Sequence, residues 1–221
     1  MIGNNFGSAG VSPLNATRFT DVKRNRSMRE DIDVGAVWPP VNPPDKADRF
    51  DRMSIVFHWL TVFLVVAQFA TALTLYWVDQ DAEELITVHR STGSLIWVVV
   101  VARLIWRHSF AHLPPFSATM PKFQQRIAIL NEYALYFLLL LQPLTGLADT
   151  LFQGRSFELL IWQVPALLER NKLAYGLFHK LHELGATALL VLVAVHATAA
   201  LFHGLVLRDS VLARMLPWTD R

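Results

Sequence analysis

Residues 181–204 read LHELGATALLVLVAVHATAALFHG, and this stretch decides the fold. Its apolar residues fall on every face of a helix, which predicts a helix surrounded by apolar material on all sides. A helix needs about 20 such residues, at about 1.5 Å each, to cross the hydrocarbon core of a bilayer. We therefore expect a membrane-spanning helix over residues 173–207, with its first turns outside the lipid.

Three stretches upstream have the same character: residues 54–78, 85–107 and 127–148. The hydrophobic fraction of the chain is 53%, which is high for a water-soluble protein. A bundle of buried helices in water is the alternative, but residues 60–78, LTVFLVVAQFATALTLYWV, are apolar on every face and would have to be covered completely. The sequence therefore predicts an all-α integral membrane protein, a four-helix bundle.

Basic residues beside the helix ends predict how this bundle lies in the membrane. They precede the first helix and occupy the loop between the second and third helices: Lys23, Arg24, Arg26, Arg29, Lys46, Arg49, Arg52, Arg107, Lys122 and Arg126. The loop between the first two helices instead contains DQDAEE at 79–84. Loops rich in lysine and arginine stay in the cytoplasm. We expect a multi-pass protein of the bacterial cytoplasmic (inner) membrane with both termini cytoplasmic.

Two segments outside the helices carry their own expectations. Residues 1–50 are rich in Gly, Asn and Pro and end in VWPPVNPPDK (37–46), so we interpret them as an extended cytoplasmic tail and docking segment, separate from the membrane domain at 51–221. The connection at 149–172 contains SFELLIWQVPALL (156–168). It is too short to span and is interrupted by Pro165, so we expect it to lie along the outer membrane surface.

Composition excludes several kinds of site. The chain has no cysteine, which excludes zinc–thiolate sites, iron–sulfur clusters and thioether-attached haem. The net charge is +2, and the basic residues cluster at helix ends instead of forming a stripe, so no nucleic-acid partner is expected.

Four histidines fall inside or at the ends of the expected membrane helices: His58, His89, His182 and His196. From His182 to His196 is 14 positions, which at about 100° per residue leaves the two side chains within about 40° of one helix face and about 21 Å apart along the axis. His58 enters from the side nearer His196, and His89 enters from the side nearer His182. Ionisable residues at such depths mark functional sites.

This arrangement predicts two stacked sites, His58 with His196 and His89 with His182. A bare zinc or copper ion needs three or four converging protein ligands, whereas haem needs two axial imidazoles because its porphyrin supplies the other four nitrogens. We therefore expect these four histidines to bind the iron of two haem b groups. A histidine that only packs and forms a hydrogen bond is the alternative for any single position.

Two further residues belong to the expected cofactor sites. Arg103, with Arg107, ends the second helix and could neutralise haem propionates, although positive flanking residues look the same. His203 lies seven positions beyond His196 on nearly the same face, where it is either a hydrogen-bonding group for a quinone or an interfacial histidine.

Several motifs together resemble the bacterial cytochrome b561 family of four-helix, dihaem membrane proteins. They run from Arg49 to Pro217: HWL (58–60), HRSTG (89–93), RLIWR (103–107), LYFLLLLQPLTG (135–146), LHELG (181–185), HATAALFH (196–203) and RDSVLARMLP (208–217). The resemblance implies that the same four histidines bind haem and that His203 lies near a quinone. This family often has a histidine where the present chain has Glu132, so the role of that residue is open.

The resemblance also implies a function. Members pass electrons to or from the ubiquinone pool, and one type oxidises superoxide at the outer face. We expect a dihaem membrane cytochrome, bound by lipid and quinone, that carries electrons between an outer donor and ubiquinone, either as a superoxide:ubiquinone oxidoreductase or as an electron carrier. The alternative is a membrane subunit of a larger respiratory complex whose other subunits contact residues 1–50. A haem-free structural or metal-transport protein is the third interpretation.

Overall fold

Four long helices make up the protein in a computed structural model that describes residues 49–77, 82–116 and 120–217. They are α2 (Arg52–Trp77), α3 (Glu83–Ser109), α4 (Lys122–Phe152) and α5 (Lys172–Leu201), which a π-helical turn, η2 (Phe202–Leu207), continues. All four are long and apolar enough to cross a membrane. The predicted four-helix membrane bundle is confirmed.

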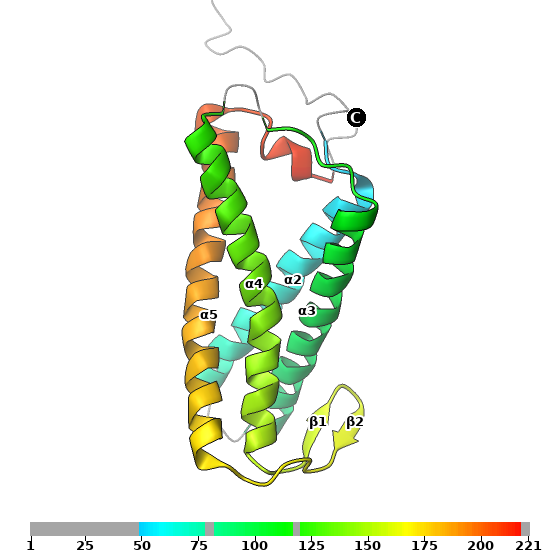
Figure 1. Ribbon diagram of the computed structural model, residues 1–221, viewed down its shortest axis with the longest axis vertical. Coiled ribbons are helices and arrows are strands. Elements are labelled where there is room, and N and C mark those ends of the chain that lie inside the picture. Colours follow the sequence, from blue (N-terminus) through cyan, green and yellow to red (C-terminus); the bar gives the residue numbers. More distant parts are fainter. Residues whose placement is uncertain (1–48, 78–81, 117–119, 218–221) are drawn as a thin grey trace, which may run out of the picture. The chain divides into compact units, whose positions relative to one another are not determined.

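The helices run up and down, so that each is antiparallel to the next (Figure 1). At one end, α2 and α4 begin and α3 and α5 end; we call it the C-terminal end, because a short 3-10 helix, η3 (Ala213–Met215), follows there. At the other end lies a two-stranded hairpin between α4 and α5, and we call it the hairpin end. The expected tail at 1–50 falls almost wholly outside the described residues, so the domain division and the docking role remain predictions.

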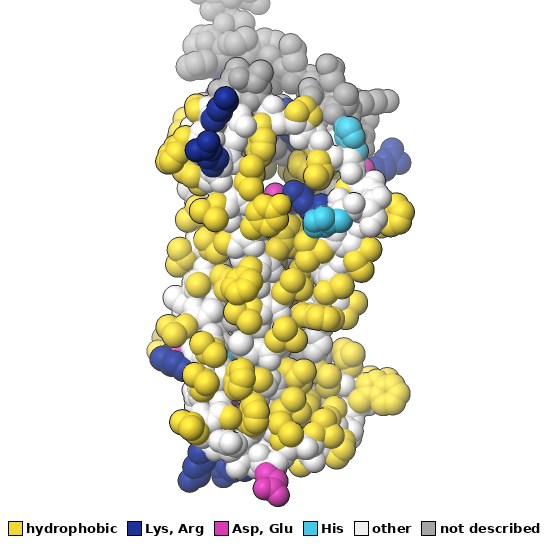
Figure 2. Space-filling view, in the orientation of Figure 1, with side chains coloured by type: hydrophobic (Ala, Val, Ile, Leu, Met, Phe, Trp, Pro, Cys, Tyr) yellow, Lys and Arg dark blue, Asp and Glu magenta, His cyan; other side chains and the backbone are white. Residues whose placement is uncertain are grey.

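The surface of the bundle is apolar along most of its length. Figure 2 shows hydrophobic side chains covering the middle of the visible face, with charged side chains near the two ends. Large apolar residues are turned outward, including Phe63, which is 69% exposed, and Leu130, which is 71% exposed. Such a band is suited to contact with lipid acyl chains and not with water.

The packed interior is a single apolar layer near the middle of the bundle. All four helices contribute to it: Leu64, Val65, Ile96, Val99, Val100, Tyr136, Leu139 and Leu189. On α5, Leu189 lies halfway along the sequence from His182 to His196. The packed layer therefore separates the two levels at which the histidines lie.

Polar contacts tie the elements together at the C-terminal end. Asp51 accepts hydrogen bonds from the backbone and side chain of Ser54 at the start of α2 and from Trp106 near the end of α3. Burial alone would raise the pKa of Asp51, but these hydrogen bonds outweigh it and hold that pKa below its ordinary value. The ionised carboxylate therefore stabilises this junction at neutral pH, and that contribution is lost as the pH falls through the lowered pKa.

The segment after α5 folds back over the same end. Trp59 donates to the carbonyl of Met215 (2.8 Å) and Arg49 to that of Leu216 (2.7 Å). Arg214 is buried and donates to the carbonyl of Pro115 in the α3–α4 loop (2.6 Å). The C-terminal segment thus joins the beginning of α2 to the loop between α3 and α4.

At the opposite end, the segment expected only to lie along the membrane surface forms a β-hairpin. Strands β1 (Phe157–Leu159) and β2 (Trp162–Val164) pair antiparallel, with Leu159 opposite Trp162. The hairpin lies beside α3 near its first turns (Figure 1). A hairpin was not predicted because its tip has none of the glycine, asparagine or aspartate that usually marks a two-residue turn.

Candidate functional site: two histidine pairs

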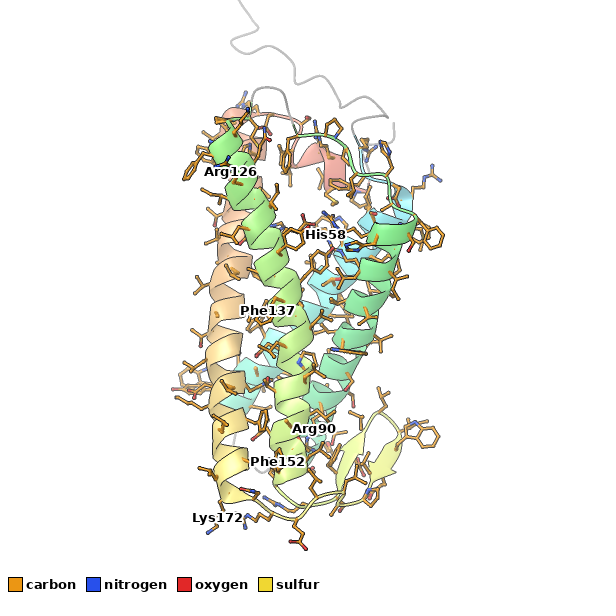
Figure 3. All side chains as sticks on the ribbon, viewed as in Figure 1. His58, Arg90, Arg126, Phe137, Phe152 and Lys172 are labelled. Atoms are coloured by element: carbon orange, nitrogen blue, oxygen red, sulfur yellow. The ribbon has the colours of Figure 1, made fainter. Side chains whose placement is uncertain are left out.

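The structure brings the four membrane histidines together in two pairs. The ring centres of His58 on α2 and His196 on α5 are 6.2 Å apart, near the C-terminal end. Those of His89 on α3 and His182 on α5 are 6.3 Å apart, near the hairpin end. Figure 3 labels His58 close to the C-terminal end and Arg90, the neighbour of His89, close to the hairpin end. Helix α5 therefore contributes one ring to each pair.

Both separations suit two imidazoles that bind one metal ion from opposite sides. Imidazole nitrogens bind metals at about 2 Å, and a ring centre lies about 1 Å behind its nitrogen, so the two centres should be about 6 Å apart. Haem is the metal group that needs only two such ligands. The spacing of the rings thus fits the expected cofactor at both levels.

Hydrogen bonds at the hairpin end hold His182 by its Nδ1 and leave the lone pair of its Nε2 available to a metal. The His182 Nδ1–H group donates to the backbone carbonyl of Gln142 (3.1 Å). It also lies 3.2 Å from the Thr145 hydroxyl oxygen, which must accept because that hydroxyl donates to the same carbonyl. With the proton held on Nδ1, Nε2 carries a lone pair. Such partners orient metal-binding histidines and fix their tautomer.

The same reasoning applies to His89 across the pair. The Thr71 hydroxyl donates to the carbonyl of Gln68, so its oxygen accepts from His89 Nδ1–H (3.0 Å). The Gln68 amide donates to His89 Nε2 (2.9 Å), while its own Oε1 is buried without a hydrogen-bond partner. Gln68 therefore marks the position of the lone pair that would bind iron. A metal there would displace this amide.

At the C-terminal end the partners come from the other two helices. Arg103 on α3 donates to His58 Nδ1 (3.3 Å) and lies over the ring of Tyr136, and Asn131 on α4 approaches His196 Nδ1 (3.5 Å). A metal-binding imidazole carries its proton on Nδ1, so Arg103 would then need another acceptor. A haem propionate is such an acceptor. The Oδ1 atom of Asn131 is buried without a hydrogen-bond partner. If the side-chain amide of Asn131 were rotated by half a turn, this oxygen would accept from the Nδ1–H group of His196.

Three glycines allow side chains at the hairpin-end pair to pack closely against the helices. A Cβ atom at Gly146 would lie 3.0 Å from the ring of His182, and one at Gly93 would lie 3.3 Å from the Gln68 amide. A Cβ at Gly185 would clash with the side chain of Gln142, whose Oε1 is buried without a partner. The buried Oε1 atoms of Gln68 and Gln142, which have no hydrogen-bond partner, fit a site where a further group supplies donors.

The two arginines at the end of α3 have different partners. Arg103 lies against His58, whereas Arg107 forms a two-pronged ion pair with Glu132 on α4, with nitrogen–oxygen distances of 2.8 and 3.0 Å. The role of Glu132, which the sequence left open, is therefore to pair with Arg107 and join α3 to α4. A bidentate pair of this kind is both stronger and more directional than a single contact.

We expect Glu132→Ala to lower the stability of the bundle by about 2 kcal/mol, between the values typical of exposed and buried ion pairs. The side chains of Arg107 and Glu132 are 24% and 35% exposed, and removal of one leaves the other charge unpaired. Thermal unfolding in detergent measures the loss. Glu183→Ala breaks an exposed pair with Lys180 and should leave the melting temperature unchanged. Equal effects of the two substitutions would contradict this role of Glu132.

His203 is close to an acidic partner that sequence reasoning missed. Its Nδ1 lies 2.5 Å from Asp209 Oδ2, and both side chains are largely buried. The π-helical turn and the left-handed backbone of Arg208 (φ 51°) bring these residues together, and neither is evident from sequence spacing. His203 is thus held by its Nδ1, which leaves Nε2 for a ligand.

The side chain of His179 is 60% exposed and lies 3.6 Å from Asp149 at the end of α4. It takes no part in either pair. The described helices thus hold two facing imidazoles at each of two levels, with polar partners from the other helices. This arrangement defines the class of the protein: a membrane helix bundle in which two pairs of histidines face each other at different depths.

The chain belongs to the prokaryotic cytochrome b561 family, whose sequence model matches residues 49–218. Among its relatives, cytochrome b561 homolog 1 of Escherichia coli is 30% identical over 77% of this chain and 98% of its own length. Cytochrome b561 homolog 2 of the same organism is 29% identical over 76% of this chain and 92% of its own length. The probable superoxide oxidase CybB of Yersinia pestis is 24% identical over 76% of this chain and 96% of its own length.

Family membership confirms the resemblance seen in the sequence. The protein is a membrane-embedded cytochrome of the b type, in contact with lipid, that binds haem b and takes part in electron transfer.

Proposed function

We propose that the protein holds two haem b groups, one between His58 and His196 and one between His89 and His182, and transfers electrons across the bacterial cytoplasmic membrane to ubiquinone. The observation that carries this proposal is the pair of ring separations, 6.2 and 6.3 Å, at two levels of the same bundle. Held by both histidines of a pair, haem would supply electron transfer and not oxygen binding.

The side chains around the pairs have distinct roles in this proposal. Gln142 and Thr145 hold His182 and Thr71 holds His89, so that each ring presents Nε2. When His58 carries its proton on Nδ1, Arg103 can no longer donate to that atom. Arg103 would instead donate to a haem propionate, because a guanidinium can only donate hydrogen bonds. Glu132 holds Arg107, which leaves Arg103 as the arginine that serves the C-terminal-end pair.

The direction of transfer follows from the orientation expected from the sequence. Lysine and arginine gather at the C-terminal end, which supports a cytoplasmic position for that end and for both termini. The hairpin end then faces outward and receives electrons from a donor there. Superoxide is the proposed donor, since one relative is named a probable superoxide oxidase. Two superoxide ions give two oxygen molecules and two electrons, and one ubiquinone takes two electrons and two protons to become ubiquinol.

We assign the quinone to the C-terminal end beside His203. The imidazole of His203 is held by Asp209 through its Nδ1. Trp59 lies at the same end, where it donates to the carbonyl of Met215. A histidine–aspartate pair can donate a hydrogen bond to a quinone oxygen and pass it a proton taken up from the cytoplasm. The two protons that ubiquinone needs would enter at this end.

Purified protein that contains haem tests the proposal directly. It should bind two haem b groups per chain and reduce a soluble ubiquinone when superoxide is generated enzymatically. The absence of b-type bands from a reduced-minus-oxidised spectrum would contradict the haem sites. Two bound haems with no reduction of ubiquinone by superoxide would instead contradict the donor or acceptor, and would favour the alternative of a subunit that works within a larger respiratory complex.

We expect His203→Gln to lower the rate of ubiquinone reduction about 100-fold, the lower end of the contribution of a positioned acid or base, without loss of haem. Asp209→Asn should have a smaller effect in the same direction, because the ring remains but its partner is neutral. His108, an exposed histidine of α3 at the same end, gives the control His108→Gln, which should be unaffected. A His203→Gln protein with unaltered steady-state rates would place the quinone elsewhere.

A further inference from the structure

The tip of the β1–β2 hairpin breaks the usual chemistry of a tight turn. Leu160 and Ile161 form the two-residue connection, and Leu160 has a left-handed backbone, with φ of 55°. Turns of this kind favour glycine, asparagine or aspartate, and a leucine there costs about 1–3 kcal/mol. A large apolar side chain kept at such a position indicates a role for the side chain itself.

The tip is also apolar and exposed. Leu160 is 58%, Ile161 90% and Trp162 69% exposed. In the strands behind the tip, Glu158 lies opposite Gln163 on one face and the two are joined by a hydrogen bond of 2.8 Å. The hairpin is therefore amphipathic, with one polar face and an apolar edge and tip. Hydrophobic side chains project sideways from the bundle where the hairpin lies (Figures 1 and 2).

The hairpin is fixed to α3 by one residue of β1 and by the backbone at its tip. Phe157 is buried, and the guanidinium of Arg90 lies over its ring at 5.6 Å. The backbone N–H of Leu160 donates to the hydroxyl of Ser91 (2.7 Å). Arg90 and Ser91 directly follow His89, so the hairpin is held by the same turn of helix that carries one of the paired histidines.

Aromatic side chains at the same end of the bundle indicate what covers the tip. At the hairpin end of α2, Tyr76 is 78% and Trp77 is 77% exposed. Tyrosine and tryptophan collect at the boundary between acyl chains and headgroups. The hairpin projects sideways beside the spanning helices instead of extending past their ends. Its tip thus lies at the same end of the bundle as Tyr76 and Trp77, which turn outward in an aromatic belt to which Trp162 would add.

We propose that this hairpin is a membrane anchor, with Leu160, Ile161 and Trp162 inserted into the boundary region of the leaflet at the hairpin end. The polar Glu158–Gln163 face is then left toward water. Because Phe157 contacts Arg90 and the backbone of Leu160 binds Ser91, insertion of the tip fixes the depth of the first turns of α3. This inference rests on the four membrane helices alone and is independent of the haem ligands and of the substrates.

Site-directed spin labelling tests the anchor cleanly, because the chain has no cysteine. Ile161→Cys is labelled in the full chain, reconstituted into vesicles of phosphatidylethanolamine and phosphatidylglycerol. Phe63→Cys gives a reference within the membrane and Glu169→Cys one in the exposed loop. We expect the label at 161 to collide several-fold more often with oxygen, which dissolves in lipid, than with a water-soluble nickel complex. A ratio equal to that at 169 overturns the proposal.

The same spectra also test whether a second copy of the chain covers the tip. Strong dipolar broadening of the label at 161 would show a second copy of the chain against the tip and would also overturn the proposal. A second measurement uses the unaltered tip, so it does not depend on the folding of the cysteine variant. Lipids brominated near the carbonyl end of the acyl chain should quench the fluorescence of Trp162, which is obtained as the difference between the unaltered chain and Trp162→Phe. No quenching of this difference signal contradicts insertion.

Discussion

Alanine substitutions of the four paired histidines are expected to lower the haem content from two to one per chain, and double substitutions should reveal the pairs. Because His58 and His196 face each other across one site, His58→Ala with His196→Ala should still leave one haem. His58→Ala with His182→Ala removes one ligand from each site and should leave none. Haem extracted as its pyridine complex, measured per mole of protein, gives the count directly.

The matched control for this series is His179→Ala, three positions from His182 but exposed and outside both pairs. It should retain both haems. A double variant of His58 and His182 that keeps one haem would show that the pairs are wrong, even if every single substitution lowers the content. The reduced-minus-oxidised spectra should also fall into two sets, one for each pair, since the two sites have different neighbours.

The second large effect is expected from a glycine. Gly146→Val should eliminate the hairpin-end haem while the other is kept, because a Cβ there lies 3.0 Å from the ring of His182. The ring cannot easily yield, since it is held by Gln142 and Thr145 on the same helix as Gly146. Overpacking of this kind costs about 1–3 kcal/mol. The spectrum of the variant should match that of His182→Ala.

Gly176→Val is the control, since a Cβ at Gly176 meets nothing within 4 Å. Both positions are helical, so the change in helix preference is the same and only the steric effect differs. Gly176→Val should retain two haems and an unaltered spectrum. If Gly146→Val also retains two haems, the space beside His182 is not required by the cofactor.

The helices could be predicted from sequence because the signal is local. Long apolar runs define them, and the 14-residue interval from His182 to His196 places both side chains near one face of a single helix. The pairing of His58 and His89 with these residues follows from the direction in which each helix enters the membrane. None of these steps requires knowledge of how the helices are rotated against one another.

What the sequence did not show depends on contacts between helices or on unusual backbone. The partners of the imidazoles, such as Thr71 and Asn131, lie on neighbouring helices, and their approach depends on helix rotation. The His203–Asp209 contact requires a π-helical turn and a left-handed residue. The hairpin was missed because Leu160 occupies a position that sequence rules give to glycine or asparagine.

One feature of α5 bears on how the protein is assembled. Of Lys172–Leu201, all of which the structure describes, only Leu189 is buried, yet this helix supplies one histidine to each pair. It packs mainly along α4, and most of its other side chains are turned outward, so few contacts join it to α2 and α3. Haem bound between the histidine pairs would then join the last helix to α2 and α3. A cell short of haem should accumulate chains whose fourth helix is loosely attached and open to membrane proteases.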